Sequence, residues 1–340
     1  MEKKYESDRL KIIFLGTPEF AVPSLEKLLN TPDIEVVGVV TQPDKRRGRG
    51  NQLSPSPIKN LALQHQIPLW QPEKIKKDTE ALAQLQELEA DFFAVVAYGQ
   101  ILSPQILEMP KQGCINVHGS LLPAYRGAAP IQWCLYHGAE QTGITTMLMD
   151  QGMDTGAMLL KKTLDISLET NAAELAIALS TLGANLLLET LYTFPQIAPI
   201  SQDATLATYA PLIKKADYEL NWHRNAIDLH NQIRGFSPHC TTTLNSQTLK
   251  ISASLPLEKD YWAKLPPAVQ KLAEINFPSK DNLGEDNPGE IVYLAKNLGI
   301  VIQTGSGLLL ITKVQPPGKG IQSAGDFANG NRLQIGTKFG

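Results

Sequence analysis

The chain has 340 residues, which is too long for one ordinary compact core and suits two domains joined by a linker. Its 43% apolar and 19% charged residues are typical of a globular protein and argue against intrinsic disorder. The net charge is -3, and no run approaches the roughly 20 uninterrupted apolar residues of a membrane span. The polar first eight residues do not form a signal peptide, and Cys114, Cys134 and Cys240 are too scattered for disulfides or zinc. We therefore expect a soluble, cytoplasmic protein.

Apolar runs alternate with amphipathic stretches through the first part of the chain. Residues 10–15 read as a buried strand, residues 16–18 as a turn and residues 19–29 as a helix. Further strands are expected at 34–41, 92–97, 114–117, 145–149 and 158–163, and a long closing helix at 171–191. This alternation predicts a Rossmann-like, doubly wound parallel sheet in a catalytic domain over residues 1–197.

The pattern changes near residues 193–215, where prolines and polar residues predict a linker, placed at 198–217. Residues 218–340 form the second expected domain, with a helix expected at 224–234 and a mobile loop at 279–289. Its expected strands lie at 241–244, 249–253, 291–293, 299–303 and 308–314. Short strands between Gly, Asn and Pro turns predict a small OB-like β-barrel.

The turn after the first strand, Gly16-Thr17-Pro18-Glu19, is not a nucleotide-binding motif. GxGxxG and GxxxxGK[ST] are both absent, which removes most support for NAD or ATP as a cofactor. In an open α/β sheet, ligands bind beyond the carboxyl ends of the strands, so these loops remain the place to look.

Asn116 and His118 end one buried strand, and alternation places both side chains on the same side of the chain. An Asn amide can donate to an oxyanion, and a His can relay a proton. Asp154, in a Gly-flanked loop after another strand, can orient His118 as a general acid–base. The alternatives are a polar pair that satisfies loop backbone and an Asx-turn aspartate, with Asp150 as the competing carboxylate.

The segment Lys45-Arg46-Arg47-Gly48-Arg49 carries four positive charges with one glycine inside it and another following. It is interpreted either as a solvated, flexible loop or as an arm that reaches the phosphates of a polyanionic partner. From Thr208 onward the chain has 14 Lys+Arg against 11 Asp+Glu, a mild excess of +3 that permits nucleic-acid contact without requiring it.

Two further loops have the composition of a ligand pocket. Residues 121–130, LLPAYRGAAP, combine an apolar wall with one cation, and residues 98–102 follow another strand end. Both can line a site for a flat heteroaromatic ligand, or they can simply pack on the edge of the sheet.

Together these motifs closely resemble the 10-formyltetrahydrofolate-dependent formyltransferases, in the branch that acts on methionyl-tRNA. The resemblance spans nearly the whole chain and is carried by the matching segments FLGTPEFA (14–21), VTQPD (40–44), SPSP (54–57), NVHGSLLP (116–123), YRGAAPIQ (125–132), DQGMDTG (150–156), IRGF (233–236) and QPPGK (315–319). The NxH, SLLP and YRGAAP combination with the aspartate loop is the most specific part.

The resemblance implies transfer of a formyl group from 10-formyltetrahydrofolate, as formyl-donor co-substrate, to the amino group of methionine on initiator tRNA, without a metal and in a monomer. The implied catalytic residues are Asn116, His118 and Asp154. The implied folate-binding residues are Ser120, Leu121, Leu122 and Pro123. The implied tRNA-binding residues, besides the C-terminal barrel, are Lys45, Arg46, Arg47 and Arg49.

The match is not uniform. Lys45 stands where the family often has Arg, residues 237–240 replace a turn that usually contains Trp, and residues 255–289 are longer than the usual connection. These departures concern tRNA docking. Three rival functions share parts of the pattern: a UDP-amino-sugar formyltransferase, a 10-formyltetrahydrofolate hydrolase, and a non-catalytic RNA-binding protein.

Overall fold

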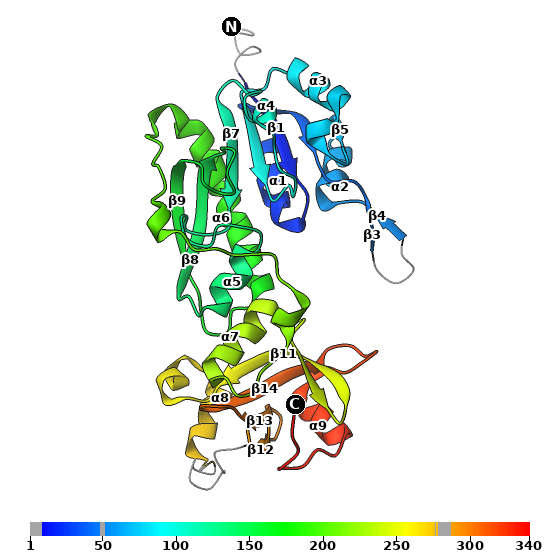
Figure 1. The fold of residues 1–340 in the computed structure, drawn as a ribbon, viewed down its shortest axis with the longest axis vertical. Coiled ribbons are helices and arrows are strands. Elements are labelled where there is room, and N and C mark those ends of the chain that lie inside the picture. The colour runs from blue at the N-terminus through cyan, green and yellow to red at the C-terminus, as the bar shows by residue number, and fades with distance from the viewer. Residues whose placement is uncertain (1–8, 48–51, 276, 278–286) are drawn as a thin grey trace. The chain divides into compact units, whose positions relative to one another are not determined.

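A computed structural model describes residues 9–47, 52–275, 277 and 287–340 (Figure 1). The chain divides into two compact units. The N-terminal unit comprises residues 1–130, 141–164 and 176–211, and the C-terminal unit comprises residues 131–140, 165–175 and 212–340. The predicted domain limits and the linker at 198–217 stay predictions. The predicted loop at 279–289 falls mostly outside the described residues.

The N-terminal unit is built on a seven-stranded sheet of order β5-β2-β1-β6-β7-β8-β9. Its strands are β1 (Leu10–Gly16), β2 (Ile34–Val40), β5 (Leu69–Trp70), β6 (Phe92–Val96), β7 (Gly113–His118), β8 (Gln141–Leu148) and β9 (Met158–Asp165). Its helices are α1 (Val22–Leu29), α2 (Pro57–Gln64), α3 (Thr79–Glu87) and α4 (Pro104–Leu107), and α6 (Ala172–Thr193) belongs mostly to it. The predicted Rossmann-like α/β architecture is confirmed.

The sequence analysis expected a parallel sheet, but not all of its strands are parallel. Strands β5, β2, β1, β6 and β7 are parallel, but β8 runs antiparallel to β7, with His118 opposite Thr145. The interpretation of residues 145–149 as a parallel-type strand was wrong. An apolar run shows that a strand is buried on both faces, and it carries no information about the direction of its neighbour.

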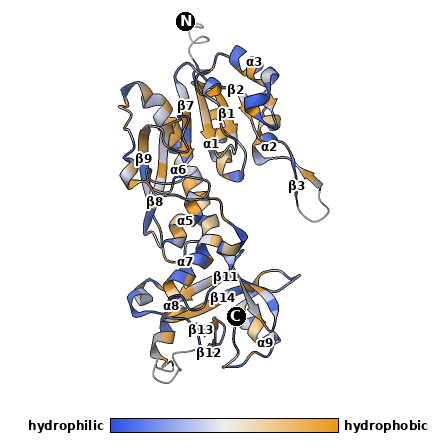
Figure 2. Cartoon of the chain, viewed as in Figure 1, coloured by the Kyte–Doolittle hydropathy of each residue, from blue (hydrophilic) through white to orange (hydrophobic). Residues whose placement is uncertain are grey.

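The core of this unit follows from the alternation of its strands. Ile13 and Leu15 of β1 lie on one face of the sheet and pack against Leu82 and Leu85 of α3. In Figure 2 most of the β1 ribbon has the hydrophobic colour. Ile12 and Phe14, on the opposite face of β1, are also 0% exposed, so this strand is covered on both faces.

Helix α6 is long and apolar. The segment Ala172–Gln196 meets the length and composition of a membrane span, and 50% of its most apolar window is buried inside the protein. Buried residues recur along it at helical spacing, at Leu175, Leu179, Leu187 and Leu191. That stripe is typical of a core helix.

The C-terminal unit contains an antiparallel sheet of order β10-β11-β14-β13-β12, with β15 pairing β14. Its elements are α5 (Pro130–Tyr136), α7 (Ala226–Phe236), β10 (Thr241–Leu244), β11 (Gln247–Pro256), α8 (Pro267–Gln270), β12 (Ile291–Ala295), β13 (Gly299–Gln303), β14 (Leu308–Gln315), β15 (Gln322–Ser323) and α9 (Ala324–Gly330). Each strand contains or overlaps a predicted one, apart from β15. Among the described strands no pairing joins β10 to β12, so the antiparallel sheet is established and its closure into a barrel is not observed.

Two apolar layers cover this sheet. Leu229 and Ile233 of α7 pack with Ile251 and Ile311 in one core. The long segment after β11 contributes to a second core. There its residues Leu265, Val269 and Leu272 pack against side chains of the sheet: Leu255, Val292, Val301 and Leu310. The described part of this segment therefore completes the hydrophobic core of the unit.

Candidate active site

Strand β7 carries two polar side chains at its carboxyl end, after the apolar residues Cys114 and Ile115. Asn116 and His118 are two residues apart, so they lie on the same face of the strand, and they are 9% and 5% exposed. No described group forms a hydrogen bond with the Asn116 amide. A nearly buried amide without a protein partner costs free energy unless a ligand or water satisfies it, so Asn116 is suited to donate to a substrate oxygen.

His118 is held through its ring nitrogens. Its Nε2 lies 3.0 Å from the backbone oxygen of Tyr125. A carbonyl oxygen only accepts, so Nε2 carries a proton in this arrangement. The other nitrogen, Nδ1, lies 3.7 Å from Oδ2 of Asp154, which is an ion-pair distance but too long for a hydrogen bond. The imidazole is thus fixed in place, with its second nitrogen facing a carboxylate.

Asp154 lies in the loop between β8 and β9 and reaches His118 across the end of the sheet. The 3.7 Å contact brings together the predicted His–Asp pair, although the structure shows no direct hydrogen bond between the two side chains. Oδ2 of Asp154 accepts a hydrogen bond of 2.8 Å from the backbone N–H of Gly127. The competing carboxylate, Asp150, bonds Gly152 and Thr155 within its own loop, as an Asx-turn aspartate does.

The backbone of the Asp154 loop is unusual. Asp154 has φ of +55°, a left-handed conformation that Asp and Asn tolerate better than most residues. Two residues on, a Cβ added to Gly156 would lie 1.7 Å from the oxygen of Leu148, so only glycine fits there. The Asp-x-Gly spacing in the sequence therefore has a conformational reason as well as a chemical one.

Gln202 braces this loop, and the sequence analysis missed it. Its Nε2 donates to the backbone oxygens of Asp154 and Gly156, at 2.8 Å each. Its Oε1 accepts from Nε and Nη2 of Arg126 at 3.0 and 2.8 Å, and Arg126 is only 5% exposed. Through these four hydrogen bonds, the Gln202 side chain connects the Asp154 loop to Arg126. No periodicity or motif marks a single Gln in an irregular stretch, so local sequence offered no signal for it.

The predicted folate segment is well ordered by its own contacts. Ser120 donates through Oγ to the oxygen of Ala124, and the Thr145 hydroxyl joins the oxygen of Ser120 to the N–H of Leu122. The Ser120 and Leu122 side chains are fully buried, whereas Leu121 and Pro123 are partly exposed. Within this segment, Leu121, Pro123 and the backbone are the groups that can meet a ligand.

Three strand-end loops of the sheet are joined to one another. The Thr17 hydroxyl donates to the oxygen of Tyr98 at 2.9 Å, and it accepts from the N–H of Gln42 at 3.3 Å. These loops follow β1, β6 and β2, and the strand order reverses between β1 and β6. Such a reversal is where ligands of open α/β sheets bind.

The basic segment is a hairpin where the sequence suggested a flexible loop. β3 (Lys45–Arg47) pairs antiparallel with β4 (Gln52–Ser54). Lys45 and Arg46 are exposed, while Arg49 lies outside the described residues. Figure 1 shows β3 and β4 projecting from the rest of the N-terminal unit.

Groups of three or more His, Cys, Asp or Glu placed to hold a metal ion are not found among the residues that the structure describes. The strand ends present an amide, an imidazole and a carboxylate, from Asn116, His118 and Asp154.

Comparison with known proteins identifies the fold and the family. Residues 10–191 match the family described as "Formyl transferase", and residues 212–332 match "Formyl transferase, C-terminal domain". The chain belongs to the formyl transferase family. A methionyl-tRNA formyltransferase of Cyanothece sp. is 61% identical over 97% of this chain and 99% of the relative, and one of Trichormus variabilis is 60% identical over the same shares.

Solved structures share the fold at low identity. The sugar 3N-formyl transferase WlaRD has a TM-score of 0.60 and 19% identity, covering 92% of this chain and 99% of that one. HypX from Aquifex aeolicus, solved with tetrahydrofolic acid, has a TM-score of 0.57 and 12% identity, covering 96% of this chain and 48% of that one. At these identities the likeness supports the fold alone.

Proposed function

We propose that this protein transfers the formyl group of 10-formyltetrahydrofolate to the free amino group of initiator methionyl-tRNA, giving N-formylmethionyl-tRNA for translation initiation. The observation that carries the chemistry is the meeting of Asn116, His118 and Asp154 at the strand ends of the N-terminal unit. The acceptor follows from relatives named methionyl-tRNA formyltransferase that are 52–61% identical over nearly the full length.

Bound 10-formyltetrahydrofolate supplies the electrophilic formyl carbon. The unpartnered Asn116 amide fits this group, because it can donate to the formyl oxygen as negative charge develops there. His118 lies two residues further along the same face of β7, and its imidazole can accept a proton from the attacking amine and deliver one to the departing N10 nitrogen. Asp154 faces Nδ1 at 3.7 Å, so it stabilises the imidazolium that forms during this relay. The new bond joins the amine to the formyl carbon, and the bond to N10 breaks.

The rival functions are not favoured. The sugar formyl transferase shares 19% identity with this chain, against 61% for the Cyanothece relative. A hydrolase would release formate without a use for a basic hairpin, and a non-catalytic RNA-binding protein would leave the Asn116–His118–Asp154 cluster without purpose.

Several finer features belong to the same proposal. Ser120, Leu121, Leu122 and Pro123 would line the folate site, mainly through the two partly exposed side chains and the backbone. The C-terminal unit would adopt an OB-like arrangement and bind tRNA. A monomer in the cytoplasm suits an enzyme whose partners are a soluble co-substrate and a tRNA.

An acceptor comparison tests the proposal. The purified protein should formylate initiator methionyl-tRNA with labelled formyl donor, and should act on elongator methionyl-tRNA and on a UDP-amino sugar at least about 100-fold less efficiently. Labelled product is measured for each acceptor. Preferential use of the sugar, or release of formate without any acceptor, would contradict the proposed acceptor.

The hairpin should contribute to tRNA use through its charge. Replacing Arg46, Arg47 and Arg49 with Ala should lower the slope of log affinity for tRNA against log salt by about 2–3, roughly one for each lost phosphate contact. The KM for the formyl donor serves as the control and should not change. If the slope of log affinity for tRNA against log salt does not change, these residues do not contact phosphates and form a solvated surface.

The Gln202 brace should affect turnover more than stability. Gln202→Glu keeps an acceptor for Arg126. It replaces the amide N–H donor with a carboxylate oxygen, which repels the backbone oxygens of Asp154 and Gly156 that Gln202 binds. We expect kcat to fall roughly 10- to 100-fold, because small displacements of catalytic groups are costly. Gln202→Ala is the matched variant, and the thermal melting temperature is measured beside kcat and KM for both. Equal kcat for Gln202→Glu and wild type would rule out this positioning role.

A further inference from the structure

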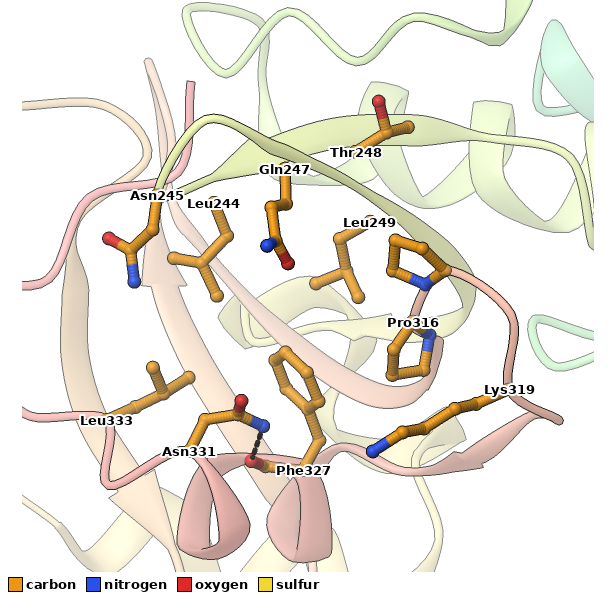
Figure 3. Close-up of a pocket in the computed structure, with 11 residues that line it drawn as sticks. Leu244, Asn245, Gln247, Thr248, Leu249, Pro316, Lys319, Phe327, Asn331 and Leu333 are labelled. Carbon is orange, nitrogen blue, oxygen red and sulfur yellow. Dashed lines mark hydrogen bonds between the residues drawn. The ribbon is translucent and has the colours of Figure 1, made fainter.

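The C-terminal unit has a cavity of about 820 Å³ that the proposed chemistry does not use (Figure 3). Three segments form its walls: residues 244–249 at the β10–β11 turn, residues 316–319 after β14, and residues 327–333 at the end of α9. Its volume falls in the range of small-molecule sites in proteins.

The floor of the cavity is apolar. Leu244, Leu249, Phe327 and Leu333 are each less than 10% exposed, and Pro316 is buried beside them. Figure 3 shows the Phe327 ring pointing into the hollow, with Pro316 at its side. These side chains offer a flat, ring-lined surface.

The rim is polar and has unused hydrogen-bonding capacity. Asn245, Gln247 and Thr248 are exposed, and in the described part of the chain their side chains form no hydrogen bond. Asn331 donates through Nδ2 to the oxygen of Phe327 at 2.8 Å, which leaves its Oδ1 available. Amide groups that both donate and accept are well suited to the edges of nucleic-acid bases.

The charge of the walls has one sign. The three wall segments contain Lys319 and Arg332 and no Asp or Glu, although Asp326 precedes the third of them. No described carboxylate lies within ion-pair distance of the Lys319 ammonium. The turn that carries Lys319 is held by the bond of 3.0 Å from the Gln315 amide to the oxygen of Lys319.

We propose that this cavity binds one unpaired nucleotide of the tRNA, with the base over Phe327 and Pro316 and its phosphate at Lys319. The flat face of a base can stack on the apolar floor, its polar edge can bond the amides of the rim, and its phosphate can pair with Lys319. A purely apolar ligand would leave the amides and the ammonium unused. The inference rests on the proposed function for the identity of the RNA, whereas binding of a nucleotide by the cavity can be tested independently.

The binding test uses the full chain and the four nucleoside 5′-monophosphates, followed by NMR through the side-chain amides of Asn245, Gln247 and Asn331. At least one monophosphate should give saturable shifts at these amides. The matching nucleoside should bind roughly tenfold more weakly, since it lacks the phosphate. Inorganic phosphate alone should not reproduce the shifts. Unmoved amide signals with all four, or equal shifts with inorganic phosphate, would overturn the proposal.

The kinetic test uses Lys319→Ala and Gln247→Ala, two exposed positions whose substitution removes no core contact. Each should raise the KM for methionyl-tRNA roughly five- to tenfold, with kcat and the KM for the formyl donor unchanged. Lys313→Ala is the matched control, because Lys313 is an exposed lysine on β14 outside the cavity. An equal rise in KM for Lys313→Ala and Lys319→Ala would overturn the proposal. Absence of formylation by the wild type would refute the proposed function. The NMR result would then decide by itself whether the cavity binds a nucleotide.

Discussion

His118→Ala should lower kcat at least about 1,000-fold with little loss of folded protein. The imidazole can accept and donate a proton, and it lies within reach of both Asp154 and the loop that follows β7. The substitution removes one hydrogen bond to Tyr125 at a strand end, so the free energy of unfolding should fall by only about 1–2 kcal/mol.

Single-turnover formylation and a thermal melt on the same preparation check this expectation. His65→Ala is the control, because His65 is exposed at the end of α2 and distant from the site in sequence. Recovery of activity by added imidazole would further support a proton-transfer role. A His118→Ala enzyme with kcat near that of the wild type would remove the imidazole from the mechanism.

Asp154→Asn should lower kcat roughly 100- to 10,000-fold while preserving the loop. Asparagine tolerates the left-handed backbone at φ of +55°, and its side-chain oxygen can still accept from the N–H of Gly127. What is lost is the negative charge 3.7 Å from Nδ1 of His118. The loss in rate therefore reports on stabilisation of the imidazolium and not on folding of the loop.

Asp154→Ala separates the two effects. Alanine loses the charge and the bond to Gly127, and it is strained at a positive φ, so its melting temperature should fall further than that of Asp154→Asn. The kcat of the two variants should be similar. If Asp154→Asn retains most of the wild-type kcat while Asp154→Ala does not, the residue serves the loop conformation alone.

Much of the architecture could be read from the sequence because its signals are local. Apolar residues predominate in β1, β2, β6 and β7, as is typical of strands covered on both faces, and polar residues stand out near the ends of these strands. For the same reason Asn116 and His118 could be assigned to one face of a strand. The motifs around them, with the Asp154 loop, sufficed to indicate the formyltransferase family.

Tertiary structure decided what depends on partners distant in the chain. The antiparallel direction of β8, the pairing of the basic segment as a hairpin and the order of the C-terminal sheet are set by which edges meet, and local hydrophobicity is silent on that. The sequence could suggest that Asp154 serves His118, but only the fold shows the 3.7 Å gap between them and the bond from Gly127. Gln202 is the clearest case. A single amide in an irregular segment has no periodicity to reveal it, and its importance comes wholly from the four hydrogen bonds that join Arg126 to the Asp154 loop.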